Sequence, residues 1–156
     1  MGPSGSGKTT FAQRHFKPTE VVSSDKCRGM VSDDEMKQSA TPAALEVLHL
    51  IVAKRLEAGL LTVVDATNLR PQARNPLLEL AQKHQVPVVA VVFDMPESLC
   101  LERNKARPGR TFGPQVVKEH VECLKQLLPG LGREGFSQVV VFNTPQEADS
   151  ARVQLV

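Results

Sequence analysis

The chain has 156 residues, 41% of them hydrophobic and 23% charged, a balance typical of one globular domain, which we expect to span 1–156. A net charge of +2 is too small to argue for nucleic-acid binding by itself, and no apolar run is long enough to cross a membrane. The three cysteines are scattered, without metal-ligand spacing, and no signal-peptide pattern is seen. We therefore expect reduced thiols in a cytoplasmic protein.

The stretch from Gly2 to Thr10 fits the phosphate-binding loop pattern, in which Gly and four residues precede Gly-Lys-Ser/Thr. Glycines let backbone N–H groups face one concavity that binds phosphate oxygens. We expect Lys8 to reach the β- and γ-phosphates of ATP and the Thr9 hydroxyl to hold Mg²⁺. A flexible Gly/Ser linker is the alternative, but the placement of Lys and Thr before an amphipathic helix disfavours it. The residues expected to contact the nucleotide here are Gly2, Ser4, Gly5, Ser6, Gly7, Lys8, Thr9 and Thr10.

Only Met1 precedes Gly2, so the buried strand that normally leads into such a loop, and is normally central, is missing from the sequence. Either the sheet is built without this strand or the start of the chain lies elsewhere. A sheet without it would present an unpaired central edge, which a partner or a second copy could fill.

The rest of the chain alternates between strands and helices. Predicted strands cover 20–23, 61–65, 86–93 and 138–142. Predicted helices cover 9–15, 41–58, 72–84, 97–107, 114–128 and 145–153, with loops at 24–29 and 31–40. This alternation predicts an α/β fold of the P-loop NTPase type, a parallel sheet with helices on both faces. Ligands of such sheets bind at the carboxyl ends of the strands.

Asp25 and Arg28 follow the first predicted strand. A carboxylate at this strand end could accept the proton of an acceptor hydroxyl, and Arg28 could grip a phosphate on the acceptor. A surface-turn aspartate paired with a solvent-facing arginine is the alternative. Asp65 ends another buried strand, where it could face the water shell of Mg²⁺; a turn cap is an equal alternative.

Three arginines follow the long predicted strand at 86–93. Arg103 and Arg107 share one helix face, and Arg110 comes just after the Pro108-Gly109 break. We expect residues of about 97–114 to form a lid whose arginines contact the triphosphate and stabilise charge in the transition state. A solvated basic face is the alternative. The four histidines show no ligand spacing and are expected to be structural or exposed.

Together these motifs resemble the kinase domain of bacterial polynucleotide kinase-phosphatases, over nearly the whole chain. The matching stretches are Gly-Pro-Ser-Gly-Ser-Gly-Lys-Thr-Thr, Ser-Asp25-Lys-Cys-Arg28-Gly, Val-Val-Asp65-Ala-Thr-Asn68, Glu-Arg103-Asn-Lys-Ala-Arg107 and Arg133-Glu-Gly-Phe.

The resemblance implies transfer of the ATP γ-phosphate to the 5′-hydroxyl end of DNA or RNA, in nucleic-acid repair. It assigns Asp25 as general base, Arg28 to the acceptor phosphate, and Arg103 and Arg107 to the ATP phosphates; Arg110 is a looser match. In this family a phosphatase, and often a ligase, follows the kinase domain, so such a module could be a partner in a longer chain. Residues 111–114 depart from the charged stretch expected there.

Two other functions fit the same motifs. One is a P-loop kinase that phosphorylates a small metabolite, and the other is a non-catalytic nucleotide-binding fragment. An Arg28 that binds a phosphate favours an acceptor that carries one. The oligomeric state stays open.

Overall fold

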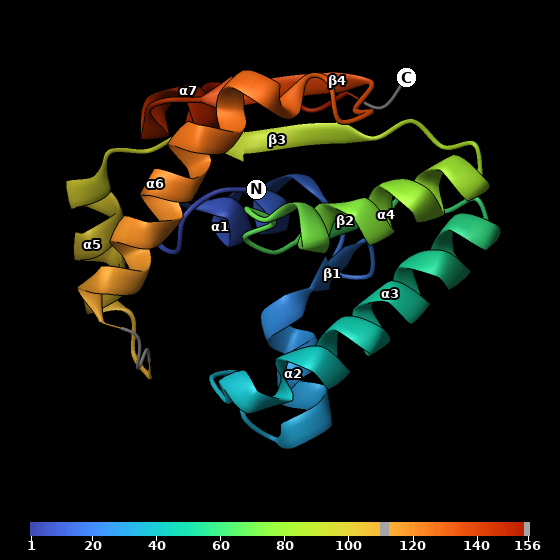
Figure 1. The fold of residues 1–156 in the computed structure, drawn as a ribbon, viewed down its shortest axis with the longest axis horizontal. Helices are drawn as coiled ribbons and strands as arrows, with labels where there is room; N and C mark the ends of the chain where they lie inside the picture. Colours follow the sequence, from blue (N-terminus) through green and yellow to red (C-terminus); the bar gives the residue numbers. More distant parts are fainter. Residues whose placement is uncertain (110–112, 155–156) are drawn as a thin grey trace.

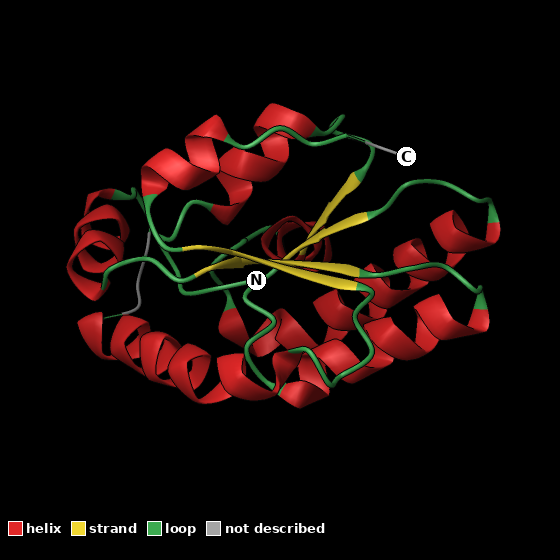
Figure 2. Ribbon diagram, turned by 90° about the horizontal axis from the view of Figure 1, so that it is seen from above, coloured by secondary structure: helices red, strands yellow, loops and turns green. Residues whose placement is uncertain are grey.

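The computed structural model describes residues 1–109 and 113–154 (Figure 1). Strands and helices alternate as the sequence predicts, and Figure 2 shows helices on both sides of the strands. Within the described residues no helix is long and apolar enough to span a bilayer. The elements are α1 Lys8–His15, β1 Val21–Ser23, α2 Ser24–Ser32, the 3-10 turn η1 Gln38–Ala40, α3 Thr41–Glu57, β2 Val63–Asp65, α4 Pro71–Lys83, β3 Val89–Phe93, α5 Glu97–Ala106, α6 Pro114–Leu131, β4 Gln138–Phe142 and α7 Pro145–Ser150.

The strands form two parallel pairs rather than the one continuous sheet expected. β1 pairs with β2, placing Ser23 opposite Asp65, and β3 pairs with β4. The start of the chain lies between the pairs (Figure 1). The Met1 amino group donates to the Val91 carbonyl, and the Met1 carbonyl accepts from the Phe93 N–H at 2.9 Å.

Among the residues that the structure describes, backbone hydrogen bonds link the two pairs at one end. The Gly2 N–H donates to the Thr67 carbonyl at 3.1 Å, so Met1 and Gly2 together link the β3 side to the loop after β2. One residue cannot replace a strand, and a cavity of about 900 Å³ extends from Met1 along the facing edges of β2 and β3. We call it the inter-sheet cavity.

Three clusters of buried apolar side chains hold the layers together. One packs α3 on the β1–β2 pair, a second packs α6 on one face of the β3–β4 pair, and a third joins α1, α5 and α7 to the other face. Fully buried members include Leu48, Val92, Val117, Leu124 and Leu131. Burying side chains of this kind stabilises by about 1.5–3 kcal/mol each.

Helix α2 replaces a predicted loop. The sequence suggested a loop at 24–29 and another from 31, whereas α2 continues to Ser32. The Ser23 side chain accepts from the Lys26 N–H at 3.5 Å and caps the helix, and Cys27 and Arg28 are buried on its inner face. Capping and burial thus outweigh the poor helix propensity of Gly29.

Two helices contain a proline in their interior. Pro76 lies inside α4, which starts at Pro71, and Pro129 lies inside α6, which was predicted to end at 128. In α6 the buried stripe continues through Leu127 to Leu131, one turn apart. The free energy gained by burying Leu131 offsets the cost of the backbone hydrogen bond that Pro129 cannot make.

Candidate active site

The phosphate loop packs tightly against its neighbours at two glycines. A Cβ on Gly2 would lie 2.7 Å from the Phe93 carbonyl oxygen, and one on Gly5 would lie 2.5 Å from the Cys100 carbonyl oxygen. Both have positive φ, +145° and +81°. Only glycine fits both requirements, so the loop holds a fixed shape at these two positions rather than acting as a flexible linker.

The Lys8 ammonium lies over the phosphate loop itself. Lys8 Nζ donates to the Pro3 carbonyl at 2.6 Å and to Ser6 Oγ at 3.3 Å. Ser4 and Ser6 are buried within the loop, whereas Thr10 is exposed on α1. A positive charge held above backbone amides is a suitable environment for a phosphate.

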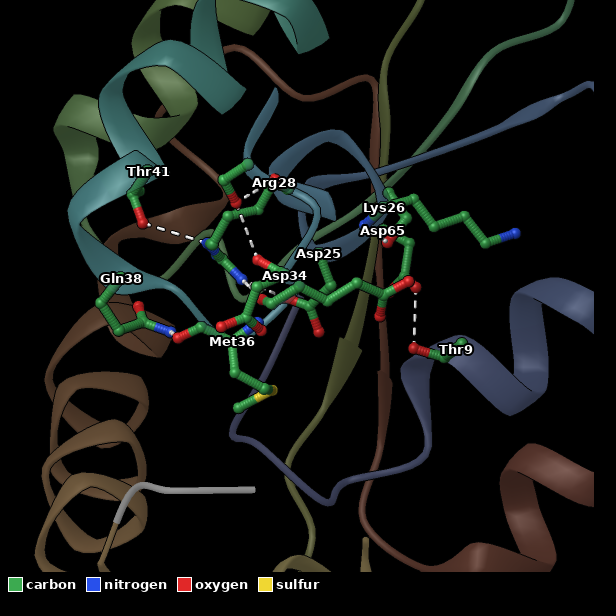
Figure 3. Close-up of polar contacts among 12 residues, drawn as sticks. Thr9, Asp25, Lys26, Arg28, Asp34, Met36, Gln38, Thr41 and Asp65 are labelled. Carbon is green, nitrogen blue, oxygen red and sulfur yellow. Dashed lines mark hydrogen bonds and ion pairs between the residues drawn. The ribbon is translucent and has the colours of Figure 1, made fainter. Parts of the chain in front are cut away.

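Thr9 and Asp65 meet at the carboxyl end of β2. The Thr9 hydroxyl donates to Asp65 Oδ2 at 2.7 Å (Figure 3). Asp65 is buried, and both side chains carry hard oxygen atoms. Mg²⁺ in nucleotide sites usually takes one or two such protein oxygens and fills its octahedron with water and phosphate oxygens. The residues present therefore fit the Mg²⁺ that the sequence predicts.

Asp25 follows β1 directly at the same edge of the strands, because Ser23 is paired with Asp65. Arg28 Nη1 lies 3.0 Å from Asp25 Oδ1, one helical turn away in α2 (Figure 3). The Arg28 side chain is 8% exposed and that of Asp25 is 31% exposed. The Asp25 carboxylate is thus held by a buried cation, while part of it still faces solvent. This arrangement differs from the alternative of a surface-turn aspartate paired with a solvent-facing arginine.

Arg28 makes more hydrogen bonds within the protein than the sequence predicts. Its Nε donates to Thr41 Oγ1 at 3.2 Å, and Nη1 also donates to the Glu35 carbonyl at 2.5 Å. Within the described residues only Nη2 lacks a hydrogen-bond partner. Arg28 therefore orients Asp25 and fixes the segment before α3, and one nitrogen remains for a ligand.

The first half of the expected lid is a helix that rests on the phosphate loop. Besides the Gly5 contact, Ser4 Oγ donates to Asn104 Oδ1 at 3.1 Å, and both residues are buried. Arg103 Nη1 lies 3.5 Å from the position of a Cβ on Gly7. Arg103 is exposed, as is Arg107, which follows the end of α5. Arg110, the third expected lid arginine, lies outside the described residues.

Two residues that contact the loop were not among the predicted site residues. Asn104 stood between expected functional residues but was assigned no role, and His120 was expected to be structural or exposed. The Ser4 N–H donates to His120 Nδ1 at 3.4 Å, so α6 also touches the loop. The spacing of His120 within α6 next to Val117, Val121 and Leu124 was the only hint, because it places the imidazole beside the buried stripe.

The cysteines offer no nucleophile to this site. Burial raises the pKa of the Cys27 and Cys100 thiols, so both remain protonated near neutral pH. Among the described residues no group of three His, Cys, Asp or Glu side chains could hold a metal ion. Metal binding here would therefore use Thr9, Asp65 and the nucleotide.

Comparison with known proteins agrees with this geometry. Residues 1–131 match the sequence model of a family described as AAA domain, a P-loop NTPase-like family that includes kinases. The chain belongs to this AAA-domain family. The phosphate loop, both strand-end aspartates and all of α5 lie within the matched part of this AAA domain.

One similar protein is the transcription factor bHLH140 of Arabidopsis thaliana, 26% identical over 155 residues. The match covers 97% of this AAA-domain chain but only 16% of the plant protein. The chain thus corresponds to a small part of that much longer relative.

Proposed function

We propose that this chain is an ATP-dependent kinase that transfers the γ-phosphate to the 5′-hydroxyl end of a polynucleotide. One observation carries the proposal. The Asp25 carboxylate, held at 3.0 Å by the buried Arg28, stands at the same strand edge as the phosphate loop and the Thr9–Asp65 pair. A nucleotide-binding site without acceptor chemistry would have no need of a buried arginine that orients a half-exposed carboxylate.

In this proposal Asp25 accepts the proton of the acceptor hydroxyl as its oxygen attacks the γ-phosphorus. The bond from γ-phosphorus to the bridging oxygen breaks, and ADP leaves with the electron pair. Arg28 holds the Asp25 carboxylate in position through the contact of 3.0 Å between Arg28 Nη1 and Asp25 Oδ1. Mg²⁺, when bound at Thr9 and Asp65, supplies charge neutralisation on the phosphates.

Cations at the phosphate loop would stabilise the negative charge that develops on the transferred phosphoryl group. Lys8 lies over the loop, and Arg103 lies beside Gly7 on the exposed face of α5. Arg107, which follows the end of α5 and is exposed, would be a further cation. Preorganised cations of this kind lower the barrier because they are in place before charge develops.

A phosphate-bearing acceptor is favoured over a simple alcohol by the charges beside the base. Lys26, which is exposed, and Arg28 both follow Asp25 within three residues in α2. A polynucleotide end carries a phosphate one nucleotide away from its 5′-hydroxyl, which these cations could bind. The resemblance to polynucleotide kinase domains agrees with this choice.

The test measures transfer of labelled γ-phosphate from ATP, with Mg²⁺, to a 5′-hydroxyl oligonucleotide. Asp25→Asn should lower the rate by about 10²–10⁴-fold. Asp33→Asn, at the exposed end of the same helix, is the matched control and should leave the rate unchanged.

Acceptor chemistry is tested with a nucleoside and its 3′-monophosphate. We expect the phosphate to lower the acceptor KM in the native chain, and Arg28→Lys to reduce that advantage. Label found on sugars or nucleosides but never on oligonucleotides would replace the proposal with a metabolite kinase. ATP binding without transfer to any acceptor would indicate a non-catalytic module.

A further inference from the structure

A buried ion pair that the proposed mechanism does not use lies beside the loop after β2. Arg74, on α4, is 2% exposed, and its Nε and Nη2 donate to the two carboxylate oxygens of Glu134 at 2.6 Å and 2.5 Å. Glu134 belongs to the stretch Arg133-Glu-Gly-Phe, to which the sequence assigned no role. It lies between α6 and β4, whereas α4 packs on the β1–β2 pair. The ion pair therefore joins two separate parts of the fold.

The remaining nitrogen of the Arg74 guanidinium reaches the loop that begins at Asp65. Arg74 Nη1 donates to the Asn68 carbonyl at 3.0 Å. Asn68 has a φ of +49°, a left-handed conformation that is uncommon for a residue with a Cβ. All three nitrogens of Arg74 are thus bonded within the protein, so this arginine holds other residues in place and offers no direct bond to a ligand.

The loop that Arg74 holds connects two parts of the candidate site. Asp65, at its start, accepts from the Thr9 hydroxyl at 2.7 Å. The Thr67 carbonyl accepts from the N–H of Gly2, the first glycine of the phosphate loop, at 3.1 Å. Asn68 follows directly, so a shift of its carbonyl would move both the Asp65 carboxylate and the support of the phosphate loop.

Stability alone is a poor explanation for a buried ion pair. The cost of removing two charges from water often exceeds their attraction, and apolar side chains of similar volume often stabilise a protein equally well. An apolar pair at positions 74 and 134 could fill the same space, but it could not donate to the Asn68 carbonyl. The position of that carbonyl is therefore what the arginine specifically provides.

We propose that Arg74 and Glu134 are positioning residues for the ATP–Mg²⁺ site. Glu134 fixes the orientation of the guanidinium, the guanidinium fixes the Asn68 carbonyl, and the loop of residues 65–68 then presents Asp65 to the metal side of the nucleotide. Outer residues that orient metal ligands commonly change metal affinity when they are replaced. This inference rests on the nucleotide-binding part of the proposed function and does not depend on the acceptor.

The experiment measures binding of a fluorescent ATP, which carries an N-methylanthraniloyl group on its ribose, over a range of Mg²⁺ concentrations. The chain has no Trp or Tyr, so protein fluorescence does not interfere. The main variant is the double replacement Arg74→Met with Glu134→Leu. Arg74→Lys is the second variant, because lysine keeps the charge beside Glu134 but lacks the planar fork that bonds Glu134 and Asn68 together. Leu48→Ala, in the buried face of α3, is the control for lost stability alone.

We expect the double variant to keep its Tm within about 5 °C of the native value, because an apolar pair can replace a buried ion pair. Its Mg²⁺ concentration for half-maximal nucleotide binding should nevertheless rise at least about tenfold, and Arg74→Lys should change it in the same direction. The Gly2 amide, followed by hydrogen exchange, should exchange at least about tenfold faster in the double variant. Leu48→Ala should lower Tm by about 5–15 °C and leave the Mg²⁺ requirement unchanged.

A native Mg²⁺ requirement in the folded double variant or in Arg74→Lys would overturn the proposal. An equal rise in Leu48→Ala would also overturn it, because the effect would then follow stability rather than position. The acceptor plays no part in these measurements. Mg²⁺-dependent nucleotide binding without transfer to any acceptor would therefore refute the proposed kinase and leave this inference intact, whereas transfer with an unchanged Mg²⁺ requirement in both pair variants would refute the inference alone.

Discussion

Gly5→Ala is the sharpest test of how α5 sits on the phosphate loop. A Cβ at this position would lie 2.5 Å from the Cys100 carbonyl oxygen and 3.3 Å from the Asn104 nitrogen, both backbone atoms of α5. Neither can turn aside as a side chain would. Alanine at φ +81° would also adopt a left-handed backbone conformation that is unfavourable for a residue with a Cβ. Strain of about 1–2 kcal/mol and overpacking of about 1–3 kcal/mol sum to roughly 2–5 kcal/mol of lost stability.

Gly7→Ala is the matched control. Its φ is +101°, so the conformational strain is similar, but the nearest atom to the new Cβ is Arg103 Nη1 at 3.5 Å, the end of a flexible side chain. This variant should lose only about 1–2 kcal/mol. Urea unfolding of both variants gives the difference, which we expect to be at least about 1 kcal/mol. Equal losses, within about 0.3 kcal/mol, would refute the packing of α5 against the loop.

Three further perturbations have defined outcomes. In a chain shown by mass spectrometry to keep a free Met1 amine, the folded pKa of about 5 lies below the unfolded value of 8.0. The unfolded state therefore binds more protons between these values, and the free energy of unfolding should rise from pH 5 to 8 by on the order of 4 kcal/mol, a rise that acetylation of the amine should abolish. Asp65→Ala removes the acceptor of the Thr9 hydroxyl and should raise the Mg²⁺ concentration for half-maximal phosphoryl transfer by about 10–100-fold, and an unchanged requirement would contradict the site. Arg74 is 2% exposed and bonds both oxygens of Glu134, so Arg74→Met should cost about 3–5 kcal/mol in urea unfolding, while a loss below 1 kcal/mol would show that the pair is solvated.

Local signals in the sequence located most of the elements. The range of β4 was predicted to the residue, and α1 differed by one residue at its start. Such elements are set by nearby turn residues and by their own apolar pattern. The cap of helix α2, Ser23, directly precedes it in the sequence, but the burial of Arg28 depends on contacts with Glu35 and Thr41, which the local sequence does not reveal.

Local sequence patterns also located part of the candidate site, as they located most of the helices and strands. The phosphate loop is a local pattern, and strand-end aspartates follow from the parallel arrangement, so Thr9, Asp25 and Asp65 could be placed near one another. Asn104 and His120 could not, because their contacts with Ser4 arise from the packing of α5 and α6. The roles of all these residues in catalysis remain predictions.

The candidate site consists of two parts of the fold, and Met1 and Gly2 link one to the other. One part, β1 and β2 with α2, carries Asp25 and Asp65, and the other, β3 with α5, carries Arg103. Among the described residues, the hydrogen bonds that join these two parts near the site include those from Gly2 to Thr67 and from Thr9 to Asp65. The reach from the proposed base to the phosphate donor therefore depends on the width of the inter-sheet cavity. If the chain transfers phosphoryl groups as proposed, a change of about 1 Å in the width of that cavity should change the transfer rate, even though the cavity lies away from the reacting atoms.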